Sequence, residues 1–450
     1  MAGTSDGKML GVVGPRYCPL QNREAFGWFQ PFLDAKEAAL HTAGSLRGGS
    51  RVWVLAKLNR DPLVVAPGDE AYWSAVRKQF PLTHDRVYFN NGTLGPSPTP
   101  VIDATRAALD AIDATGEYAG WETARPKIAA FTGVEESEIA LTHNVTEGIN
   151  IIAGGLSLSR GDEVIMTNHE HVGNALPWLN RMRLDGVVIR TFTPAMTADE
   201  NLERVNDLIT SRTRVIAVPH ITCTAGLVLP VAEIARLGHD KGLLVFFDGA
   251  HGPGTTPLDL RAMGCDFYAS CGHKWLCGPK GTGFLYVRKE LLDIVQARWV
   301  GGYSDKGWDL TVTPPEFQGY VPTAHRYDFG TQNAALSIGL AAAVEFMGKI
   351  GMENVAQRGR MLATRLQEGL LALGERVEML TPTEARSRGP IIGFRLKNIA
   401  YDAFGAHAVK RGFRIRLVPE SHLNSIRIST HIYNSPAEVD AFLDAVREVA

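Results

Sequence analysis

Between about residue 100 and residue 300, continuous apolar runs of strand length alternate with helical stretches. Runs that are apolar at every position are typical of parallel strands that are covered by helices on both faces. Helical stretches at 201–209 and 231–237 separate these runs, which include Glu163–Met166, Val215–Val218 and Leu243–Phe247. The sequence therefore predicts an α/β fold whose large domain contains a mostly parallel sheet.

The chain is expected to have three parts. Residues 1–85 are predicted to form an N-terminal arm or helical extension, residues 86–345 the large domain, and residues 346–450 a smaller α+β domain at the C-terminus. Within the arm, Ala35–Leu40 predicts a helix, and Val52–Leu55 predicts a strand or part of a helix.

The composition excludes several classes of protein. Of the 450 residues 45% are hydrophobic and 21% are charged, and the net charge of −2 gives no reason to expect nucleic acid or an anionic membrane as a partner. No apolar run reaches the length of a membrane span, and the N-terminus lacks the pattern of a secretory signal. Five cysteines without a CxxC pair predict reduced thiols in a cytoplasmic protein, with neither a disulfide framework nor a metal site.

Lys274 lies between an apolar run and a loop rich in glycine and proline, within the segment DFYASCGHKWLCGPKGTGFLYV (266–287). A single lysine is usually a solvated surface cation. Aromatic and apolar neighbours, however, are the surroundings in which an amine loses its charge and becomes a nucleophile. Such a lysine can bind the aldehyde of pyridoxal 5'-phosphate (PLP) as a Schiff base.

Two further residues follow apolar runs at positions that suit the same cofactor. Asp248 ends the run 243–247, where it either caps a turn or pairs with a cation such as the protonated pyridine nitrogen of PLP. Thr146 follows the strand predicted at 139–142 and begins a helix, where it either caps the helix or helps to bind a phosphate.

The segment GHKWLCGPKGTGFLYV resembles the cofactor-lysine segment of class V aminotransferase-fold enzymes. That group includes cysteine desulfurases, kynureninases and isopenicillin N epimerases, and the segment is most similar to the isopenicillin N epimerase-like branch. The resemblance extends from about Arg86 to the C-terminus. It implies the type I fold of PLP-dependent transferases, PLP as cofactor, and a homodimer with shared active sites.

The resemblance also implies roles for individual residues. Lys274 would carry the cofactor, Asp248 would pair with the ring nitrogen, and His171, which otherwise reads as a structural histidine, would stack on the ring. Further cofactor contacts are implied for Thr146, Glu147, His251, His273 and, from the second subunit, Thr331. Substrate contacts are implied for Asn91, Asn174 and Arg427, where Arg427 resembles the clamp on the substrate carboxylate rather than an exposed arginine in a salt bridge.

The sequence departs from the pattern of cysteine desulfurases at several positions. Cys223 stands where those enzymes have an asparagine, and His251 stands where they have a glutamine. The segment 410–416, which matches their late loop, contains no cysteine, and no cysteine follows Cys277. These departures predict that the chain is not a persulfide-forming cysteine desulfurase.

The expected substrate is a small α-amino acid, and Lys274 is the expected base at its Cα. Epimerisation or β-elimination of a specialised amino acid, for example C–S lysis, is the first interpretation. Tyr303 and Tyr320 are candidates for the second acid/base group that an epimerase requires. The alternatives are an aminotransferase and, in a different class, a non-catalytic binding protein with the PLP-enzyme fold.

Overall fold

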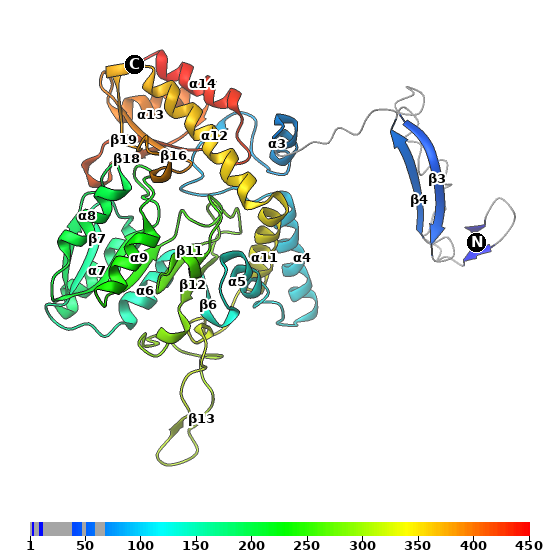
Figure 1. Cartoon of the computed structure of the whole chain (residues 1–450). Coiled ribbons are helices and arrows are strands. Elements are labelled where there is room, and N and C mark those ends of the chain that lie inside the picture. Colours follow the sequence, from blue (N-terminus) through cyan, green and yellow to red (C-terminus); the bar gives the residue numbers. More distant parts are fainter. Residues whose placement is uncertain (1, 4–8, 12–37, 47–50, 59–67) are drawn as a thin grey trace. The chain divides into compact units, whose positions relative to one another are not determined.

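The computed structural model of the chain describes residues 2–3, 9–11, 38–46, 51–58 and 68–450 (Figure 1). The chain divides into two compact units, Met1–Asp69 and Glu70–Ala450. The first unit contains two antiparallel pairs of strands, β1 (Ala2–Gly3) with β2 (Met9–Gly11) and β3 (Ala38–Leu46) with β4 (Arg51–Leu58).

The helix predicted over Ala35–Leu40 is wrong for Ala38–Leu40, which begins β3, while residues 35–37 lie outside the described part of the chain. Alanine and leucine favour helices as single residues, but strand pairing with β4 overrides so short a local preference. Val52–Leu55 lies within β4, as the strand interpretation of that segment expected.

The second unit contains the remaining elements. Its helices are α3 (Glu70–Arg77), α4 (Thr99–Thr115), α5 (Ala124–Thr132), α6 (Val145–Gly155), α7 (Val172–Asp185), α8 (Ala198–Leu208), α9 (Val231–Asp240), α10 (Leu260–Met263), α11 (Ala334–Ile350), α12 (Met352–Leu371), α13 (Tyr401–Lys410) and α14 (Pro436–Arg447). Its strands are β5 (Val87–Tyr88), β6 (Ile139–Thr142), β7 (Glu163–Thr167), β8 (Val188–Phe192), β9 (Thr213–Pro219), β10 (Leu244–Asp248), β11 (Phe267–Cys271), β12 (Gly283–Val287), β13 (Trp308–Asp309), β14 (Glu316–Phe317), β15 (Val377–Met379), β16 (Ile391–Leu396), β17 (Phe413–Arg414), β18 (Arg416–Val418) and β19 (Ser425–Ser429).

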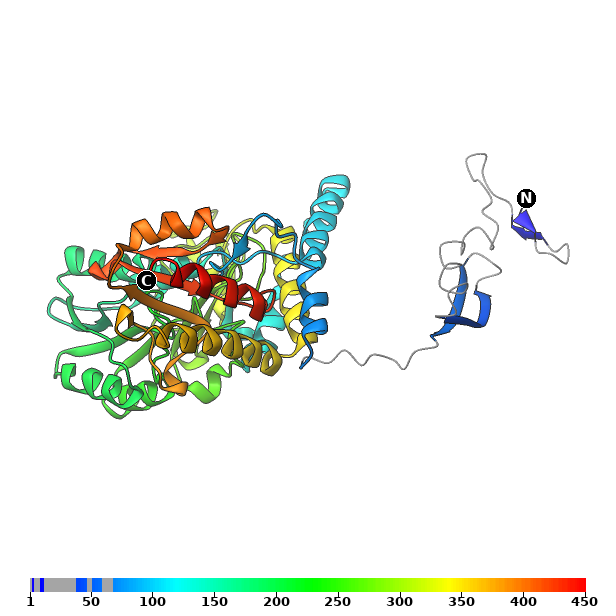
Figure 2. The same ribbon diagram turned by 90° about the horizontal axis from the view of Figure 1, so that it is seen from above.

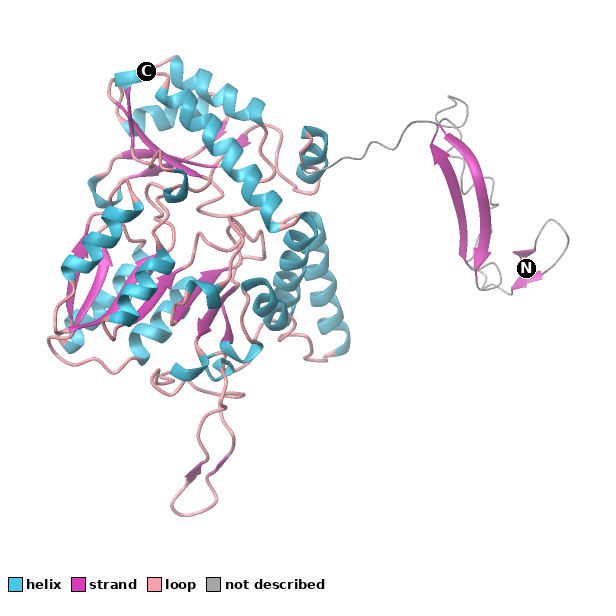
Figure 3. Cartoon of the chain, viewed as in Figure 1, coloured by secondary structure: helices cyan, strands magenta, loops and turns pink. Residues whose placement is uncertain are grey.

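A seven-stranded sheet with the order β6-β12-β11-β10-β9-β7-β8 forms the centre of this unit (Figure 3). Neighbouring strands are parallel except where β12 is involved, which is antiparallel to both β6 and β11. The predicted α/β fold with a mostly parallel sheet is therefore confirmed.

Successive residues of the central strands pack into different cores on the two faces of this sheet. In β10, Val245 and Phe247 pack on the face that α9 and α11 cover, whereas Phe246 packs on the opposite face with residues of α6 and α7. Because both faces are buried, β10 is apolar from Leu244 to Phe247. Its polar residue, Asp248, stands where the strand ends, and the carboxyl edge of such a sheet is where ligands bind.

A second, antiparallel sheet with the order β15-β16-β19-β18 packs with α12, α13 and α14 around a separate core. These helices lie above the seven-stranded sheet in Figure 1 and on the near side in Figure 2. Phe89 belongs to this core, because β5 pairs with β17 and carries the start of the unit into the C-terminal region. The predicted boundary between residues 345 and 346 falls inside helix α11. The division of the chain into three parts stays a prediction.

No single helix in the described ranges is long and apolar enough to cross a membrane. Helices α11 and α12, which are bent by 77° at their junction, are together long and apolar enough by length and composition alone. Among all described residues, no group of three or more His, Cys, Asp and Glu side chains could hold a metal ion.

Candidate active site

A cavity of about 200 Å³ opens at the carboxyl edge of the seven-stranded sheet. The loops after β10 and β11, the first turn of α6, the start of α7 and strand β19 each supply part of its wall. Six of the residues predicted for the site line it: Thr146, His171, His251, His273, Lys274 and Arg427. Residues more than 280 positions apart in the chain thus meet at one place, as the pattern of polar residues after apolar strands predicted.

Lys274 is not a solvated surface cation, because only 9% of the residue is exposed. No carboxylate of the described residues lies within ion-pair distance of its Nζ, which is 3.4 Å from Nε2 of His251. The loop after β5 packs on its backbone: Gly95 N–H donates to the carbonyl of His273 at 2.7 Å, and a Cβ on Gly95 would lie 1.8 Å from the carbonyl oxygen of Lys274. A glycine is therefore required at position 95 to hold the lysine in this place.

Asp248 ends β10 with only 4% of the residue exposed. Its Oδ1 accepts the N–H of Ala250 at 2.9 Å, and it forms no ion pair with any residue in the part of the chain that the structure describes. Burial raises the pKa of this carboxyl group, because the anion lacks both water and a cationic partner. A ligand that brings a positive charge to this point would remove that cost.

The first turn of α6 offers groups that suit an anion. Asn144 caps the helix by accepting the N–H of Glu147 at 3.0 Å, while the hydroxyl of Thr146 has no hydrogen bond to any described residue. A Cβ on Gly173 would lie 2.4 Å from that hydroxyl, so the glycine keeps the space around Thr146 open. Nδ1 of His273 is buried and also has no partner. Free amides at a helix N-terminus, a hydroxyl and an imidazole together can bind a phosphate.

His171 is the N-cap of α7, and its Nδ1 accepts the N–H of Gly173 at 3.0 Å. Burial lowers the pKa of His171 to about 4, so the ring that lines the cavity is neutral at physiological pH. Glu170 and Asn174 lie behind it: Asn174 Nδ2 donates to the Glu170 carboxyl group at 2.8 Å, and burial raises the pKa of Glu170 to about 8.

Arg427 is 3% exposed and has no carboxylate partner among the described residues. Its two terminal nitrogens donate to the carbonyl of Cys223 at 2.5 Å and to the hydroxyl of Thr93 at 2.8 Å, while its Nε is buried without a partner. Burial lowers the pKa of Arg427 to about 10. A buried guanidinium without a counter-ion on the wall of a cavity is suited to bind the carboxylate of a substrate.

Five of the predicted site residues are not among those that line this cavity, and one of them is Asp248, whose carboxyl group is described above. The carboxyl group of Glu147 accepts the backbone N–H of His143 at 2.6 Å and its ring N–H at 2.8 Å. Asn91 accepts the hydroxyl of Tyr433 at 3.0 Å and is followed by two residues that do line the wall. The other two are Asn174, bonded to Glu170, and Thr331, which is exposed.

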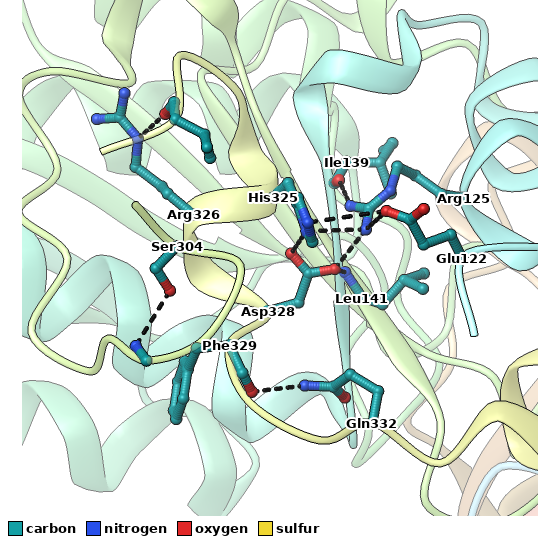
Figure 4. Close-up of polar contacts among 12 residues, drawn as sticks. Glu122, Arg125, Ile139, Leu141, Ser304, His325, Arg326, Asp328, Phe329 and Gln332 are labelled. Carbon is teal, nitrogen blue, oxygen red and sulfur yellow. Dashed lines mark hydrogen bonds and ion pairs between the residues drawn. The ribbon is translucent and has the colours of Figure 1, made fainter. Parts of the chain in front are cut away.

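A network of buried charges holds the segment that precedes Thr331 (Figure 4). The carboxyl group of Asp328 accepts from the guanidinium of Arg125 at 2.6 Å and contacts Nδ1 of His325 at 2.8 Å. Tyr303 stacks on His325, and neither Tyr303 nor Tyr320 lines the cavity that contains Lys274. The loop around Thr331 is therefore anchored to β6 and α5 and presents its threonine outward.

Two titratable residues on the cavity wall, Arg416 and Cys223, were not assigned a role from the sequence. Arg416 pairs with Glu420 four residues later and lies beside the cavity with its neighbour Arg427. Cys223 lies below Arg427, and burial raises the pKa of its thiol to about 11. The arginine-rich segment at 411–416 could have indicated Arg416 as a site residue, and the position of Cys223 after β9 could have indicated Cys223.

The chain belongs to the class-V aminotransferase family, whose model matches residues 106–442. Residues 9–72 match a domain of unknown function (DUF932). A probable cysteine desulfurase of Methanothermobacter thermautotrophicus is 30% identical over 83% of this chain and 97% of its own, and the isopenicillin N epimerase of Amycolatopsis lactamdurans is 30% identical over 84% and 98%.

Solved structures agree with this assignment. The apo cysteine desulfurase of Thermococcus onnurineus NA1 is 26% identical, with a TM-score of 0.75 over 83% of this chain and 97% of its own. The cystine C–S lyase C-DES, in complex with its product cysteine persulfide, is 25% identical with a TM-score of 0.76 over 83% and 100%. A variant of C-DES carries glycine covalently linked to the PLP cofactor.

These comparisons confirm the predicted family and PLP as the cofactor. They do not single out the isopenicillin N epimerase-like branch, because relatives of both names are 30% identical to the chain. The exclusion of a cysteine desulfurase is wrong, since relatives with that name align over 83% of the chain. The exclusion depended on a few departures, at Cys223, at His251 and in the cysteine-free segment 410–416, and these positions do not determine the fold.

The residues of the cavity fit PLP. Asp248 lacks a cation, which the protonated ring nitrogen supplies, and Thr146 with the unpartnered Nδ1 of His273 offers groups to the phosphate. Lys274 provides the amine for the aldehyde, and His171 provides a flat, neutral ring.

Proposed function

We propose that this PLP-dependent enzyme cleaves the Cβ–S bond of a sulfur-containing α-amino acid by β-elimination. The observation that carries the proposal is that one cavity contains both a buried amine, Lys274, and a buried guanidinium, Arg427, neither of which has a carboxylate partner among the described residues. An amino acid brings the carboxylate that Arg427 lacks and a Cα proton for the amine to remove.

In the proposed reaction, Arg427 binds and orients the substrate carboxylate, and the amine of Lys274 takes the proton from Cα. Bound PLP supplies an electron sink for the Cα–H electron pair, and Asp248 keeps its ring nitrogen protonated. The Cβ–S bond then breaks, the sulfur leaves with its electron pair, and Lys274 gives the proton taken from Cα to that sulfur. The remaining 2-aminoacrylate takes up one water and hydrolyses to pyruvate and ammonia.

Cleavage of a C–S bond is supported by the names of the relatives, which include cysteine desulfurases and a cystine C–S lyase. Epimerisation is the second candidate, favoured by the relative named isopenicillin N epimerase. It requires an acid/base group opposite Lys274, and the two tyrosines predicted for that role do not line the cavity. Elimination needs no acid/base group other than Lys274. Transamination is a third possible reaction, and the assay below distinguishes it from the other two by its products.

We further propose that the protein works as a homodimer in a reducing, cytoplasmic compartment. Thr331 is exposed and lies three residues after Asp328, which Arg125 holds, so it is placed where a second subunit could contact it. The hairpin of β13 and β14 projects from the unit with exposed Trp308 and Leu310, apolar side chains that a second copy would cover (Figure 1). Cys265, Cys271 and Cys277 are buried and form no disulfide.

The test is a panel of cysteine, cystine, cysteine S-conjugates and sulfur-free amino acids incubated with the PLP-loaded protein in deuterated water. Pyruvate with a released thiol or persulfide supports elimination, and Cα exchange without other products supports epimerisation. A 2-oxo acid with aminated cofactor supports transamination, and alanine with sulfane sulfur supports a desulfurase. The proposal fails if sulfur amino acids give no pyruvate.

A further inference from the structure

Trp275, the residue after Lys274, contacts the imidazole of His251. Its indole Nε1 donates to Nδ1 of His251 at 2.9 Å. An indole N–H can only donate, so Nδ1 of His251 is the unprotonated, accepting nitrogen. Burial lowers the pKa of His251 well below its usual value, so the ring is neutral and its single proton is on Nε2.

The protonated Nε2 of His251 faces the amine of Lys274, and the two nitrogens are 3.4 Å apart. An ammonium group has three donors and no acceptor, so it cannot accept the N–H of the imidazole. A neutral amine has a lone pair that can. The N–H of His251 thus points at the nitrogen whose lone pair attacks an aldehyde or removes a proton.

We propose that Trp275 is a positioning residue that fixes the Nε2–H tautomer of His251 and so directs a hydrogen-bond donor at the amine of Lys274. The inference deepens the proposed function, since it concerns the same amine. It depends only on the geometry of the chain, and not on which amino acid reacts.

Other contacts hold the indole against His251. Trp275 is fully buried, its carbonyl accepts from Nε2 of His431 at 2.9 Å, and the two rings meet edge to face with centroids 5.3 Å apart. On the other side, Gly254 has a left-handed φ of 89°, and a Cβ there would lie 2.3 Å from the carbonyl carbon of Trp275. The backbone of Trp275 is therefore held on two sides, and its buried indole packs against His431 while it donates to His251.

The direct test is the ¹⁵N spectrum of the His251 ring in the full-length, PLP-loaded protein, assigned by comparison with His251→Phe. The wild type is expected to carry its proton on Nε2. Trp275→Phe, which removes the donor with the five-membered ring of the indole and keeps a six-membered ring, is expected to give a mixture of tautomers. A proton on Nδ1, or on both nitrogens, in the wild type overturns the proposal. That reading stands even if the variant does not fold.

Trp178 provides a matched control. It is also a fully buried tryptophan, but its Nε1 has no hydrogen-bond partner among the residues that the structure describes. Trp178→Phe thus removes the same atoms from the core without removing a bond to a histidine, and the His251 spectrum should not change. An equal change in both variants would assign the effect to packing and overturn the proposal.

A kinetic readout tests the consequence for Lys274. We expect cofactor-free Trp275→Phe to capture added PLP about tenfold more slowly than the wild type, which corresponds to the loss of one hydrogen bond. In a His251→Phe background the same substitution should change the rate less than about twofold, since the effect is transmitted through the imidazole. Equal slowing in both backgrounds overturns the proposal.

This rate is also set by the other charged and titratable groups that face Lys274. They are Asp248 from β10, His171 from α7, His273 from its own loop, and Arg416 and Arg427 from the C-terminal sheet. None of them contacts the indole nitrogen, so Trp275→Phe leaves them in place. Capture of PLP precedes any reaction of a substrate, so a failure of this proposal is distinguishable from a failure of the proposed C–S cleavage.

Discussion

Replacing Arg427 by glutamine tests whether the buried guanidinium serves the substrate or the fold. Burial lowers its pKa to about 10, which corresponds to a cost of about 3 kcal/mol for keeping the side chain charged in the folded protein. Its hydrogen bonds to the Cys223 carbonyl and the Thr93 hydroxyl each stabilise the fold by about 1.5 kcal/mol. The two contributions cancel, so the free energy of unfolding should change by less than about 1 kcal/mol.

The effect of the same substitution on catalysis should be large. A guanidinium that binds a carboxylate makes two charge-assisted hydrogen bonds, and their loss costs about 3 to 4 kcal/mol, or roughly 100- to 1000-fold in kcat/KM. The assay is steady-state kinetics with the most active substrate of the panel, together with urea unfolding of the PLP-loaded protein. Arg427→Gln with kcat/KM within about threefold of the wild type would refute the assignment of the substrate clamp.

Arg358 offers a control with the opposite expectation. It is also buried, but it donates to Glu70 at 3.0 Å and to the carbonyl of Asn434 at 2.7 Å, and it does not line the cavity. Arg358→Gln should lose about 2 to 3 kcal/mol of stability and keep kcat/KM within about threefold. If the two arginine variants behave alike, the distinction between a clamp and a structural cation is wrong.

Three further substitutions test other parts of the site. In the cofactor-free protein, burial raises the pKa of Asp248, so the ionised carboxyl group destabilises the fold as pH rises. Asp248→Asn should therefore be more stable than the wild type in urea at neutral pH. A loss of stability would contradict this. His171→Gln should lower kcat/KM roughly tenfold or more. Because the pKa of His171 is about 4, any inflection near pH 6.5 in the pH profile of kcat/KM should remain in this variant. Loss of an inflection near pH 6.5 would contradict a neutral His171 ring. Arg125→Gln leaves Asp328 buried without its guanidinium and should destabilise the protein by about 3 kcal/mol in urea unfolding, whereas a change below about 1 kcal/mol means that the network does not hold this loop.

The sequence predicted the inner strands β9 and β10 of the central sheet, because their middle residues are buried on both faces and therefore apolar. The runs Val215–Val218 and Leu243–Phe247 correspond to β9 and β10 for this reason. The segment Ala35–Leu40 carried no such pattern, and its prediction as a helix depended on propensity alone. Pairing between β3 and β4 decided the conformation of Ala38–Leu40 instead, and pairing over a distance cannot be read from six residues.

The position of a residue after a strand predicted which loops reach the cavity, but not which way each side chain points. Lys274, His171 and Arg427 do line the cavity. Glu147 lies on the same first turn of α6 as Thr146, yet its carboxyl group turns back to His143. The contact between Trp275 and His251 joins two loops that are 24 positions apart, and only the folded structure shows it.

The central claim is that the amine of Lys274 holds the cofactor. The most direct measurement is to treat the PLP-loaded protein with borohydride, digest it and locate the modified lysine by mass spectrometry. The account predicts the mass of the reduced cofactor on the peptide that contains Lys274. Modification of another lysine, such as the nearby Lys280, or of none would contradict it.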